Sequence, residues 1–383
     1  MIYLDHAAST PMRDEVIQEM MPYFKENYGN PSSIHRYGRM ATKAIENARK
    51  RIADLINAHP DEILFTSGGT ESNNTALFGA VPPNGQLITS SIEHDAVLEP
   101  CKKLHAQGCT VRYLSVDGLG TVNLDDLKNS ITKSTSLVSI MYANNEVGTV
   151  QPIREIVKLC QENSVLFHSD AVQAAGKIPI DVKEIGIDLM SISSHKINGP
   201  KGIGALYVKR GTKLAPFVLG GGQESGMRSG TENVASIVGF GKACQIAKDG
   251  LAENSTHMKS LCDRLIEKVT GQISHVTVNG HRQNRLPNNA HFTFLGVNGE
   301  DLIIKLDEHG IAASTGSACS VKTQKASHVL AAMGFSHEQI TGSLRLTVGL
   351  GNTEDEIDKT VDALKKIVVE LRAVSPFKAK YGF

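Results

Sequence analysis

The stretch from residue 137 to residue 171 contains three segments, LVSIMYAN (137–144), PIREIVKLCQENS (152–164) and VLFHSDA (165–171). The first and the third are short and rich in apolar and β-branched residues, which predicts strands. The second has apolar residues at helical spacing, which predicts a helix between the two strands. This strand–helix–strand order is typical of a mainly parallel sheet that is covered by helices.

The same alternation extends along the chain on both sides of this stretch. Further strands are predicted at EILFTSG (62–68), QLITSS (86–91), TVRYLSV (110–116) and DLMSISS (188–194). We therefore expect an α/β fold in which residues 15–255 form a large domain around a mainly parallel sheet.

After about residue 255 the pattern changes to a mixture of short strands and longer helices. The predicted elements are a helix, strands at HVTVNG (275–280) and NNAHFTFLG (288–296), a helix at GEDLIIKLDEHG (299–310), a strand at SLRLTVG (343–349) and a helix from NTEDEID (352–358) onward. We expect residues 1–14 and 256–383 to form a smaller α+β domain, and two domains agree with the length of the chain.

The composition excludes several classes of function. The chain has 40 basic and 40 acidic residues, so its formal net charge is zero and it offers no basic footprint for nucleic acid. No run approaches the roughly 18 apolar residues that cross a membrane, and the start MIYLDHAASTP lacks the pattern of an export signal. We therefore expect a cytoplasmic protein. We also expect no metal site, because none of the six cysteines has zinc-ligand spacing.

Ligands of such sheets bind at the carboxyl ends of the strands, so the polar residues that follow each strand are candidates for a site. FTSGGTESNN (65–74) passes from a strand through two glycines into a helix and offers backbone N–H groups of Gly69, Thr70 and Glu71 to an anion such as phosphate. A tight turn with Thr70 as the helix cap is the alternative.

Three further side chains follow predicted strands. Asp170 ends the strand in HSDAVQAAG (168–176), Lys196 follows the strand in SISSHKINGPKG (191–202), and His94 lies in SSIEHDAV (90–97). Each alone has an ordinary alternative, such as a lysine that reaches solvent or a histidine that caps a helix. A lysine amine, a carboxylate for a pyridinium N–H and a phosphate cup are together what pyridoxal phosphate requires.

Six motifs in combination resemble the cysteine desulfurases, which belong to the class V aminotransferase group of fold-type I pyridoxal phosphate enzymes. The motifs are TSGGTESNN, NNEVGT, HSDAVQ, SSHKINGPKGIGALYV, RSGTEN and STGSACS, and the resemblance extends from residue 3 to about residue 358. The GSAC sequence resembles the branch of the family that has the longer mobile cysteine loop.

The resemblance implies roles around the cofactor ring. Lys196 would form the Schiff base, Asp170 would pair with the pyridine nitrogen, Gln173 would contact the phenolic oxygen, and His94 would stack on the ring and take part in catalysis.

The resemblance also implies residues for the phosphate and for the substrate. Gly69, Thr70, Ser193 and His195 would hold the phosphate, together with Thr231 of the neighbouring subunit in a homodimer. Asn145 would lie beside cofactor and substrate, and Arg345 would clamp the substrate carboxylate, for which a planar guanidinium is suited. An ordinary salt bridge is the alternative for this arginine.

STGSACS places Cys319 among small and polar residues that do not predict a core position. Little packing is expected for Gly316, Ser317 and Ala318, so the thiol could approach the cofactor and then carry sulfur outward. The resemblance implies that L-cysteine becomes L-alanine while Cys319 takes the sulfur as a persulfide. His94 is one candidate for the base that generates the thiolate.

The acceptor of the sulfur stays open, between a scaffold for iron–sulfur clusters and an enzyme of tRNA thiolation. Family members that dock a scaffold commonly have a tail longer than SPFKAKYGF (375–383), so scaffold binding is less expected than desulfuration. A selenocysteine lyase or another class V aminotransferase would share Lys196 and Asp170 but would not need Cys319. A non-enzymatic sulfur carrier would not need the cofactor residues.

Overall fold

The computed structural model describes residues 1–316 and 326–382, and its largest sheet has seven strands in the order β2-β8-β7-β6-β5-β3-β4. The strands are β2 (Ile63–Thr66), β3 (Gln86–Ser90), β4 (Thr110–Leu114), β5 (Thr135–Ser139), β6 (Leu166–Asp170), β7 (Leu189–Ser193) and β8 (Gly204–Val208). Each strand predicted before residue 195 is present, with ends that differ by a few residues.

The prediction of a mainly parallel sheet is confirmed. Five neighbouring strands pair in parallel, in the order β4, β3, β5, β6 and β7. In contrast, β8 is antiparallel to both of its neighbours, β7 and β2. β8 was not predicted as a strand, and its sequence GALYV (204–208) directly follows the segment NGPKGI (198–203). As a result of the two antiparallel pairings, β2 runs in the same direction as β7, and the carboxyl ends of β2, β3, β5, β6 and β7 lie at one edge.

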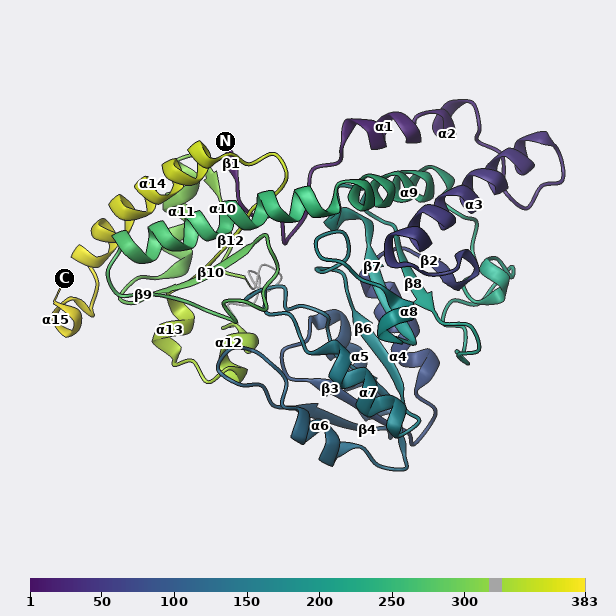
Figure 1. The fold of residues 1–383 in the computed structure, drawn as a ribbon, viewed down its shortest axis with the longest axis horizontal. Helices are drawn as coiled ribbons and strands as arrows, with labels where there is room; N and C mark the ends of the chain where they lie inside the picture. The colour runs from purple at the N-terminus through teal and green to yellow at the C-terminus, as the bar shows by residue number, and fades with distance from the viewer. Residues whose placement is uncertain (317–325, 383) are drawn as a thin grey trace.

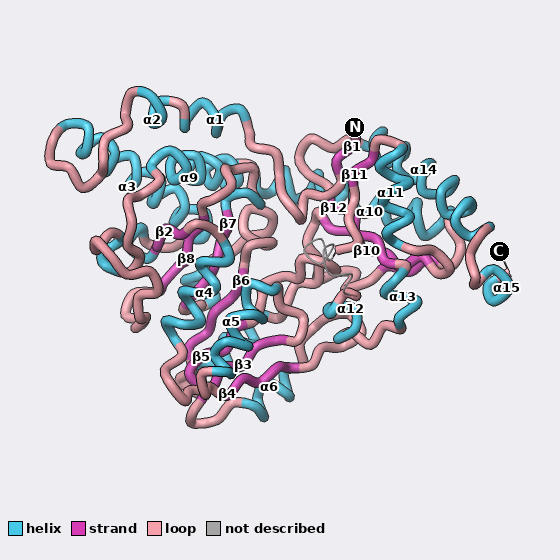
Figure 2. The backbone as a smooth tube through the Cα atoms, turned by 180° about the vertical axis from the view of Figure 1, so that it is seen from behind, coloured by secondary structure: helices cyan, strands magenta, loops and turns pink. Residues whose placement is uncertain are grey.

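Helices cover both faces of this sheet (Figures 1 and 2). The helices of this part of the chain are α1 (Asp14–Met20), α2 (Pro22–Lys25), α3 (Arg36–Ile56), α4 (Gly69–Ala80), α5 (Asp95–Ala106), α6 (Leu124–Ser130), α7 (Ile153–Glu162), α8 (Val182–Ile185) and α9 (Val234–Asp249), with short 3-10 turns at Pro60–Glu62, Ser194–Lys196 and Glu224–Gly226.

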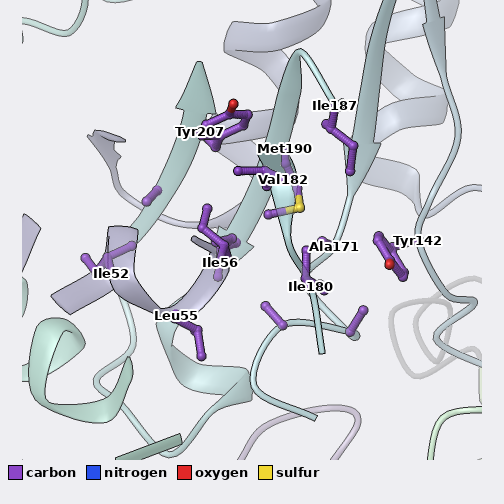
Figure 3. Packing of buried hydrophobic residues seen from close by; sticks show 14 of the residues in the cluster. Ile52, Leu55, Ile56, Tyr142, Ala171, Ile180, Val182, Ile187, Met190 and Tyr207 are labelled. Carbon is purple, nitrogen blue, oxygen red and sulfur yellow. The ribbon is translucent and has the colours of Figure 1, made fainter. Parts of the chain in front are cut away.

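The period of two along each strand separates the core into two layers. In β2, Ile63 and Phe65 join the cluster formed with α3, α7 and α9, whereas Leu64 joins the cluster under α4 and α5. Figure 3 shows part of the first cluster, which includes Ile52 and Ile56 of α3 and Met190 of the sheet. Burial on both faces explains why these strands are almost continuously apolar.

The C-terminal part has a sheet of three antiparallel strands in the order β12-β10-β9. Its elements are α10 (Leu251–Gln272), β9 (Val276–Val278), β10 (Asn289–Phe294), α11 (Gly299–Glu308), β11 (Ile311–Ala312), α12 (His328–Ala332), α13 (His337–Thr341), β12 (Ser343–Thr347), α14 (Glu354–Ala373) and α15 (Lys378–Tyr381). Its core joins α10, α11 and α14 to the sheet.

The N-terminal strand β1 (Ile2–Tyr3) pairs in parallel with β11, so the chain begins among the C-terminal elements (Figure 1). The next residues then cross to the large sheet, where Thr10 N–H donates to the carbonyl of His195. The domain limits of 15–255 on one side and 1–14 with 256–383 on the other stay a prediction. The crossing of residues 5–10 matters for function, because it takes the N-terminal segment over the carboxyl edge of the large sheet.

Candidate active site

A cavity of about 320 Å³ lies at the carboxyl edge of the large sheet. Its lining comes from the loops after β2, β3, β5, β6 and β7, from the N-terminal segment and from the C-terminal part. The predicted site residues that line it are Gly69, Thr70, His94, Asn145, Asp170, Gln173, Ser193, His195, Lys196 and Arg345. A volume of this size is typical of a site for a small molecule or cofactor.

Lys196 enters the cavity from the short 3-10 turn that follows β7. Its ammonium donates hydrogen bonds to the carbonyl oxygens of Ala7 (2.5 Å) and Ala8 (2.8 Å), in the segment that crosses the sheet edge. These two carbonyl oxygens hold the amine against the N-terminal segment.

Asp170 is buried at the end of β6, where its carboxylate is held from two sides. Oδ1 accepts the N–H of Val172 (3.0 Å), and Oδ2 accepts Asn73 Nδ2 (2.6 Å) from α4. Gln173, on the next turn of the chain, donates from Nε2 to the carbonyl of Ala7 (3.0 Å). Asp170 therefore presents a fixed carboxylate to the cavity while part of its desolvation cost is offset by hydrogen bonds.

The helix α4 begins at Gly69, and its N-terminus faces the cavity. Gly68 occupies the N-cap with a φ of 152°, and no side chain of the described residues caps the helix, so the alternative of a Thr70 cap is wrong. A Cβ on Gly69 would lie 2.7 Å from Cγ2 of Val172, which explains the glycine. Uncapped N–H groups at the start of a 12-residue helix form an anion site.

Glu71 is turned out of this anion site. Its carboxylate pairs with Arg228 (2.8 Å) and accepts the N–H of Ser67 (2.8 Å), and these contacts hold its pKa below the usual value in spite of burial. The negative charge next to the helix start is therefore neutralised by Arg228.

Ser193 and His195 form the other side of the anion site. Burial lowers the pKa of His195 to about 4, and the nearby charges of Lys196 and Lys201 act in the same direction. The ring is therefore neutral at physiological pH and contributes an N–H donor.

Arg345 is buried on β12 and reaches the cavity from the C-terminal part. Nη2 pairs with Asp5 (2.8 Å), and Nη1 donates to the carbonyls of Asn145 (2.9 Å) and Gly316 (3.2 Å). Nε of Arg345 and Oδ1 of Asn145 are buried without a hydrogen-bond partner among the described residues. The arginine is thus oriented by three contacts, and both unpartnered atoms belong to residues that line the cavity.

The expectation of little packing is wrong for Gly316. This residue is buried, donates its N–H to Ser314 Oγ (3.1 Å), and has a φ of 99°. A Cβ on it would lie 3.3 Å from both Glu146 Oε2 and His291 Nε2, so a side chain would crowd these groups, and the positive φ also favours glycine. Cys319, with Ser317 and Ala318, lies outside the described residues.

His94 is the N-cap of α5, and its Nδ1 accepts the N–H of Ala96 (3.0 Å). The capping alternative is therefore correct, yet the ring also lines the cavity. The preceding residue, Glu93, is fully buried and accepts Ser90 Oγ (2.6 Å) and the N–H of Met141 (2.9 Å). Burial raises the pKa of Glu93 to about 8, so this carboxyl group is mostly protonated at pH 7.

Comparison with known proteins identifies the family. The class-V aminotransferase family matches residues 2–360. The cysteine desulfurase IscS of Dictyoglomus turgidum is 50% identical over 384 residues, which cover 99% of this chain and 98% of that protein. The chain belongs to the class-V aminotransferases, among the cysteine desulfurases.

Solved structures agree with this membership. A structure described as a NifS-like protein has a TM-score of 0.91 at 37% identity and covers 96% of this chain and 99% of its own. A structure of SspA in complex with cysteine has a TM-score of 0.82 at 37% identity, with 91% and 99% covered. The fold is that of the fold-type I pyridoxal phosphate enzymes, as expected.

Cysteine desulfurases depend on pyridoxal phosphate, and the residues of this cavity fit that cofactor. The uncapped start of α4 suits the phosphate, the hydrogen-bonded carboxylate of Asp170 suits a protonated ring nitrogen, and Lys196 supplies the amine. Arg345 Nε and Asn145 Oδ1 remain for a polar ligand. This chain is therefore a pyridoxal phosphate-dependent cysteine desulfurase.

Thr231 does not line the cavity of its own chain. It is exposed in the loop before α9, close in sequence to Arg228, which pairs with Glu71.

The described residues contain no helix that is long and apolar enough to cross a membrane.

Sequence reasoning missed several residues of the desulfurase site. They are Asp5, Asn73, Glu146 and His328, together with the carbonyls of Ala7 and Ala8. Asn73 could have been found, because it lies one helical turn after Gly69 on the side that faces the sheet. The others depend on contacts between distant parts of the chain, which no local pattern predicts.

Proposed function

We propose that this enzyme converts L-cysteine to L-alanine in the cavity at the carboxyl edge of the large sheet and passes the sulfur to Cys319. The observation that carries the proposal is the convergence of Lys196, Asp170, the start of α4 and Arg345 on one cavity. From Cys319 the sulfur would go to a protein acceptor for iron–sulfur cluster assembly.

Pyridoxal phosphate, when bound, supplies an electron sink for negative charge that develops on the amino acid. Lys196 provides the amine that carries the cofactor and later moves protons at the α-carbon of the substrate. Asp170 would accept a hydrogen bond from the pyridine N–H of the cofactor and stabilise its positive charge, while Asn73 keeps the carboxylate in orientation. Gln173 and His94, which also line the cavity, would contact the ring of the cofactor.

The phosphate group would be held by donors of this chain. These donors are the N–H groups of Gly69 and Thr70, the hydroxyl groups of Thr70 and Ser193, and the neutral ring of His195. Because His195 is neutral, it adds a hydrogen bond but no full positive charge.

Arg345 orients the substrate by binding its carboxylate. Asp5 holds the guanidinium from behind through Nη2, and the unpartnered Nε has no competing acceptor among the described residues. Asn145, whose carbonyl also accepts from Arg345, offers its side chain to the same ligand. A guanidinium fixed in this manner binds a carboxylate with little loss of side-chain entropy.

Sulfur transfer requires a nucleophile in addition to the cofactor site. The thiolate of Cys319 would attack the sulfur of the bound substrate, so that an S–S bond forms and the Cβ–S bond breaks. The bonding electron pair stays with the carbon skeleton, which takes up a proton and leaves as alanine. A serine would not serve, because its hydroxyl group is far less nucleophilic than a thiolate at neutral pH.

A homodimer with shared sites is supported by several exposed apolar side chains between residues 17 and 37. The side chains are Ile17, Met21, Phe24, Tyr28, Ile34 and Tyr37, of which Ile34 is 92% exposed. Such a patch on a soluble protein commonly marks an interface. Thr231 would then reach the phosphate in the neighbouring subunit, which agrees with its position outside the cavity of its own chain.

The dimer proposal is tested by mass and by complementation. The unmodified protein in solution should have twice the chain mass of 41.2 kDa. Ile34→Asp should lower this mass toward that of one chain. Val374→Asp is the control, because Val374 is 82% exposed in another part of the molecule, and it should leave the mass unchanged. Lys196→Ala and Thr231→Glu should each be inactive alone, and their co-expression should restore activity through one intact site per mixed dimer. Failure to restore activity would argue against shared sites.

The desulfurase assignment itself is tested by Cys319→Ser. This variant should bind pyridoxal phosphate but release no alanine from L-cysteine, and mass spectrometry of the unmodified enzyme should find one added sulfur on the peptide that contains Cys319. Cys109→Ser is the control, since Cys109 is a buried thiol away from the cavity. Alanine release by Cys319→Ser at the parental rate would refute the role of this thiol.

Iron–sulfur cluster assembly, tRNA thiolation and a cytoplasmic location remain parts of the proposal. A pull-down with the enzyme trapped as its persulfide separates the two acceptor classes. A selenocysteine lyase without a protein nucleophile is not favoured, since the similarity is to cysteine desulfurases over nearly the whole chain.

A further inference from the structure

Three histidines, His94, His195 and His328, line the cavity, and hydrogen bonds to the backbone fix the neutral tautomer of His94 and of His328. Nδ1 of His94 accepts the N–H of Ala96 at 3.0 Å. A nitrogen that accepts a hydrogen bond carries no proton, so a neutral His94 has its proton on Nε2. The free edge of this ring is therefore an N–H donor.

His328 is the first residue of α12. Its ring is hydrogen-bonded through Nε2, whereas the ring of His94 is hydrogen-bonded through Nδ1. Nε2 lies 2.9 Å from the carbonyl oxygen of Glu93, and because a carbonyl only accepts, Nε2 must carry the proton. In the neutral ring Nδ1 then has a free lone pair, and it has no hydrogen-bond partner among the described residues. The two rings thus have the same tautomer but present opposite functions at their free edges.

The position of His328 is fixed from two sides. Its neighbour Ser327 caps α12 and donates from Oγ to Glu146 Oε2 (2.6 Å), in the loop after β5. Glu93, whose carbonyl holds the ring, is itself anchored by Ser90 and Met141. A base held in one orientation by hydrogen bonds is a common feature of general-base catalysis.

We infer that His328 is a catalytic base of this enzyme, and that its Nδ1 takes the proton from the thiol of bound L-cysteine. This inference rests on the proposed desulfurase function. The S–H bond of the substrate breaks, its electron pair stays on sulfur, and the proton forms an Nδ1–H bond that makes the ring an imidazolium. The proton later leaves to water or to the carbon skeleton that becomes alanine.

The substrate thiol is a suitable partner for an imidazole. In water the two groups differ by only about two pKa units, so the transfer is modestly uphill and is favoured by any stabilisation of the imidazolium. His94 is less suited to this step, because its lone pair is used in the helix cap.

The surroundings of His328 contain charges of both signs. The charged and titratable groups that share the cavity with it or lie in the loops packed against α12 are Glu93, His94, Asp95, Glu146, Asp170, His195, Lys196 and Arg345. Glu93 and Glu146 both have their pKa raised by burial, which favours the neutral form of these two carboxyl groups beside α12.

The test is His328→Gln, compared with His337→Gln. Glutamine keeps an N–H that can donate to the carbonyl of Glu93 but has no basic lone pair. His337 is a matched control, because it is also the first residue of a five-residue helix after a serine cap and does not line the cavity. At pH 7.5, kcat/KM for L-cysteine should fall about 100-fold or more in His328→Gln and stay within about twofold in His337→Gln.

Two further measurements separate a base from a merely structural residue. The acid limb of the pH profile of kcat/KM should lose one ionisation in His328→Gln. The exchange of the α-hydrogen of L-alanine with D₂O, which involves no thiol, should keep its parental rate, as should the visible absorbance of the bound cofactor. An unchanged acid limb, or equal losses in exchange and desulfuration, would overturn the inference.

The outcomes also separate this inference from the proposed function. If the unmodified enzyme released no alanine from L-cysteine, the desulfurase assignment would be wrong. If the unmodified enzyme were active and His328→Gln kept both the rate and the acid limb, only the assignment of the base would be wrong.

Discussion

Arg345 Nη2 lies 2.8 Å from Asp5 Oδ1, so an ion pair joins β12 to a residue 340 positions earlier in the chain. The same N-terminal segment supplies the carbonyls that hold Lys196. The amine proposed to carry the cofactor and the guanidinium proposed to bind the substrate carboxylate are therefore positioned by one short segment, residues 5–8.

Replacement of Arg345 by lysine should raise the KM for L-cysteine. A lysine keeps the charge but cannot form the two parallel hydrogen bonds, and the loss of about 1–3 kcal/mol corresponds to roughly a 5- to 150-fold rise. Arg264→Lys is the matched control, because Arg264 forms an exposed pair with Asp358 outside the cavity. Steady-state kinetics of both variants is the measurement, and an unchanged KM in Arg345→Lys would place the carboxylate site elsewhere.

Replacement of Asn73 by alanine should weaken cofactor binding. The variant removes the 2.6 Å hydrogen bond to Asp170 and leaves one carboxylate oxygen without its partner in a buried site. We expect the Kd for pyridoxal phosphate to rise about tenfold, which corresponds to about 1.4 kcal/mol. Asn74→Ala, whose side chain bonds to the carbonyl of Thr70 instead, should have little effect in the same titration. Equal affinities in the two variants would contradict the role of Asn73.

Stability should depend on pH through Glu93. Its pKa is raised by burial from 4.5 to about 8, so the folded protein retains a proton that the unfolded chain loses above about pH 4.5. This contribution to the free energy of unfolding is complete below pH 4.5 and is lost as the pH rises toward 8, by up to about 1.4 kcal/mol per pH unit.

The variant Glu93→Gln mimics the protonated carboxyl at every pH, and its amide oxygen can accept from Ser90 and Met141. Between pH 5 and pH 7.5 the unmodified protein should lose about 3 kcal/mol relative to this variant, measured by urea unfolding. Glu99→Gln, at an exposed position on α5, should show no such divergence. Parallel curves for Glu93→Gln and the unmodified protein would mean that Glu93 is ionised in the folded state.

Local patterns predicted the elements that carry the site, and the structure explains why. The strands β2, β3, β5, β6 and β7 are buried on both faces, so their apolar runs are conspicuous in the sequence. Parallel strands then bring the residues that follow them to one edge, which is why Thr70, Asp170 and Lys196 meet although they are far apart in the chain.

Other parts of the site could not be predicted from the sequence. The pairing of Asp5 with Arg345 and of His328 with Glu93 depends on how the C-terminal part packs against the large sheet. The burial of Gly316 also could not be predicted. It is enclosed by Glu146, from the loop after β5 of the large sheet, and by His291, from β10 of the small sheet. The sequence around it contains small residues, which are equally compatible with a loose loop and with a tight contact.

The attachment point of the cofactor is the most direct test of the central claim. Borohydride reduction of the purified yellow enzyme, followed by peptide mapping, should find a pyridoxyl group on Lys196 alone. Lys177 is the informative competitor, because it is buried near Lys196 and burial lowers its pKa to about 7, which also makes its amine reactive at neutral pH. A label on Lys196 is the result that the account predicts, whereas a label on Lys177, on another lysine or on none would contradict it.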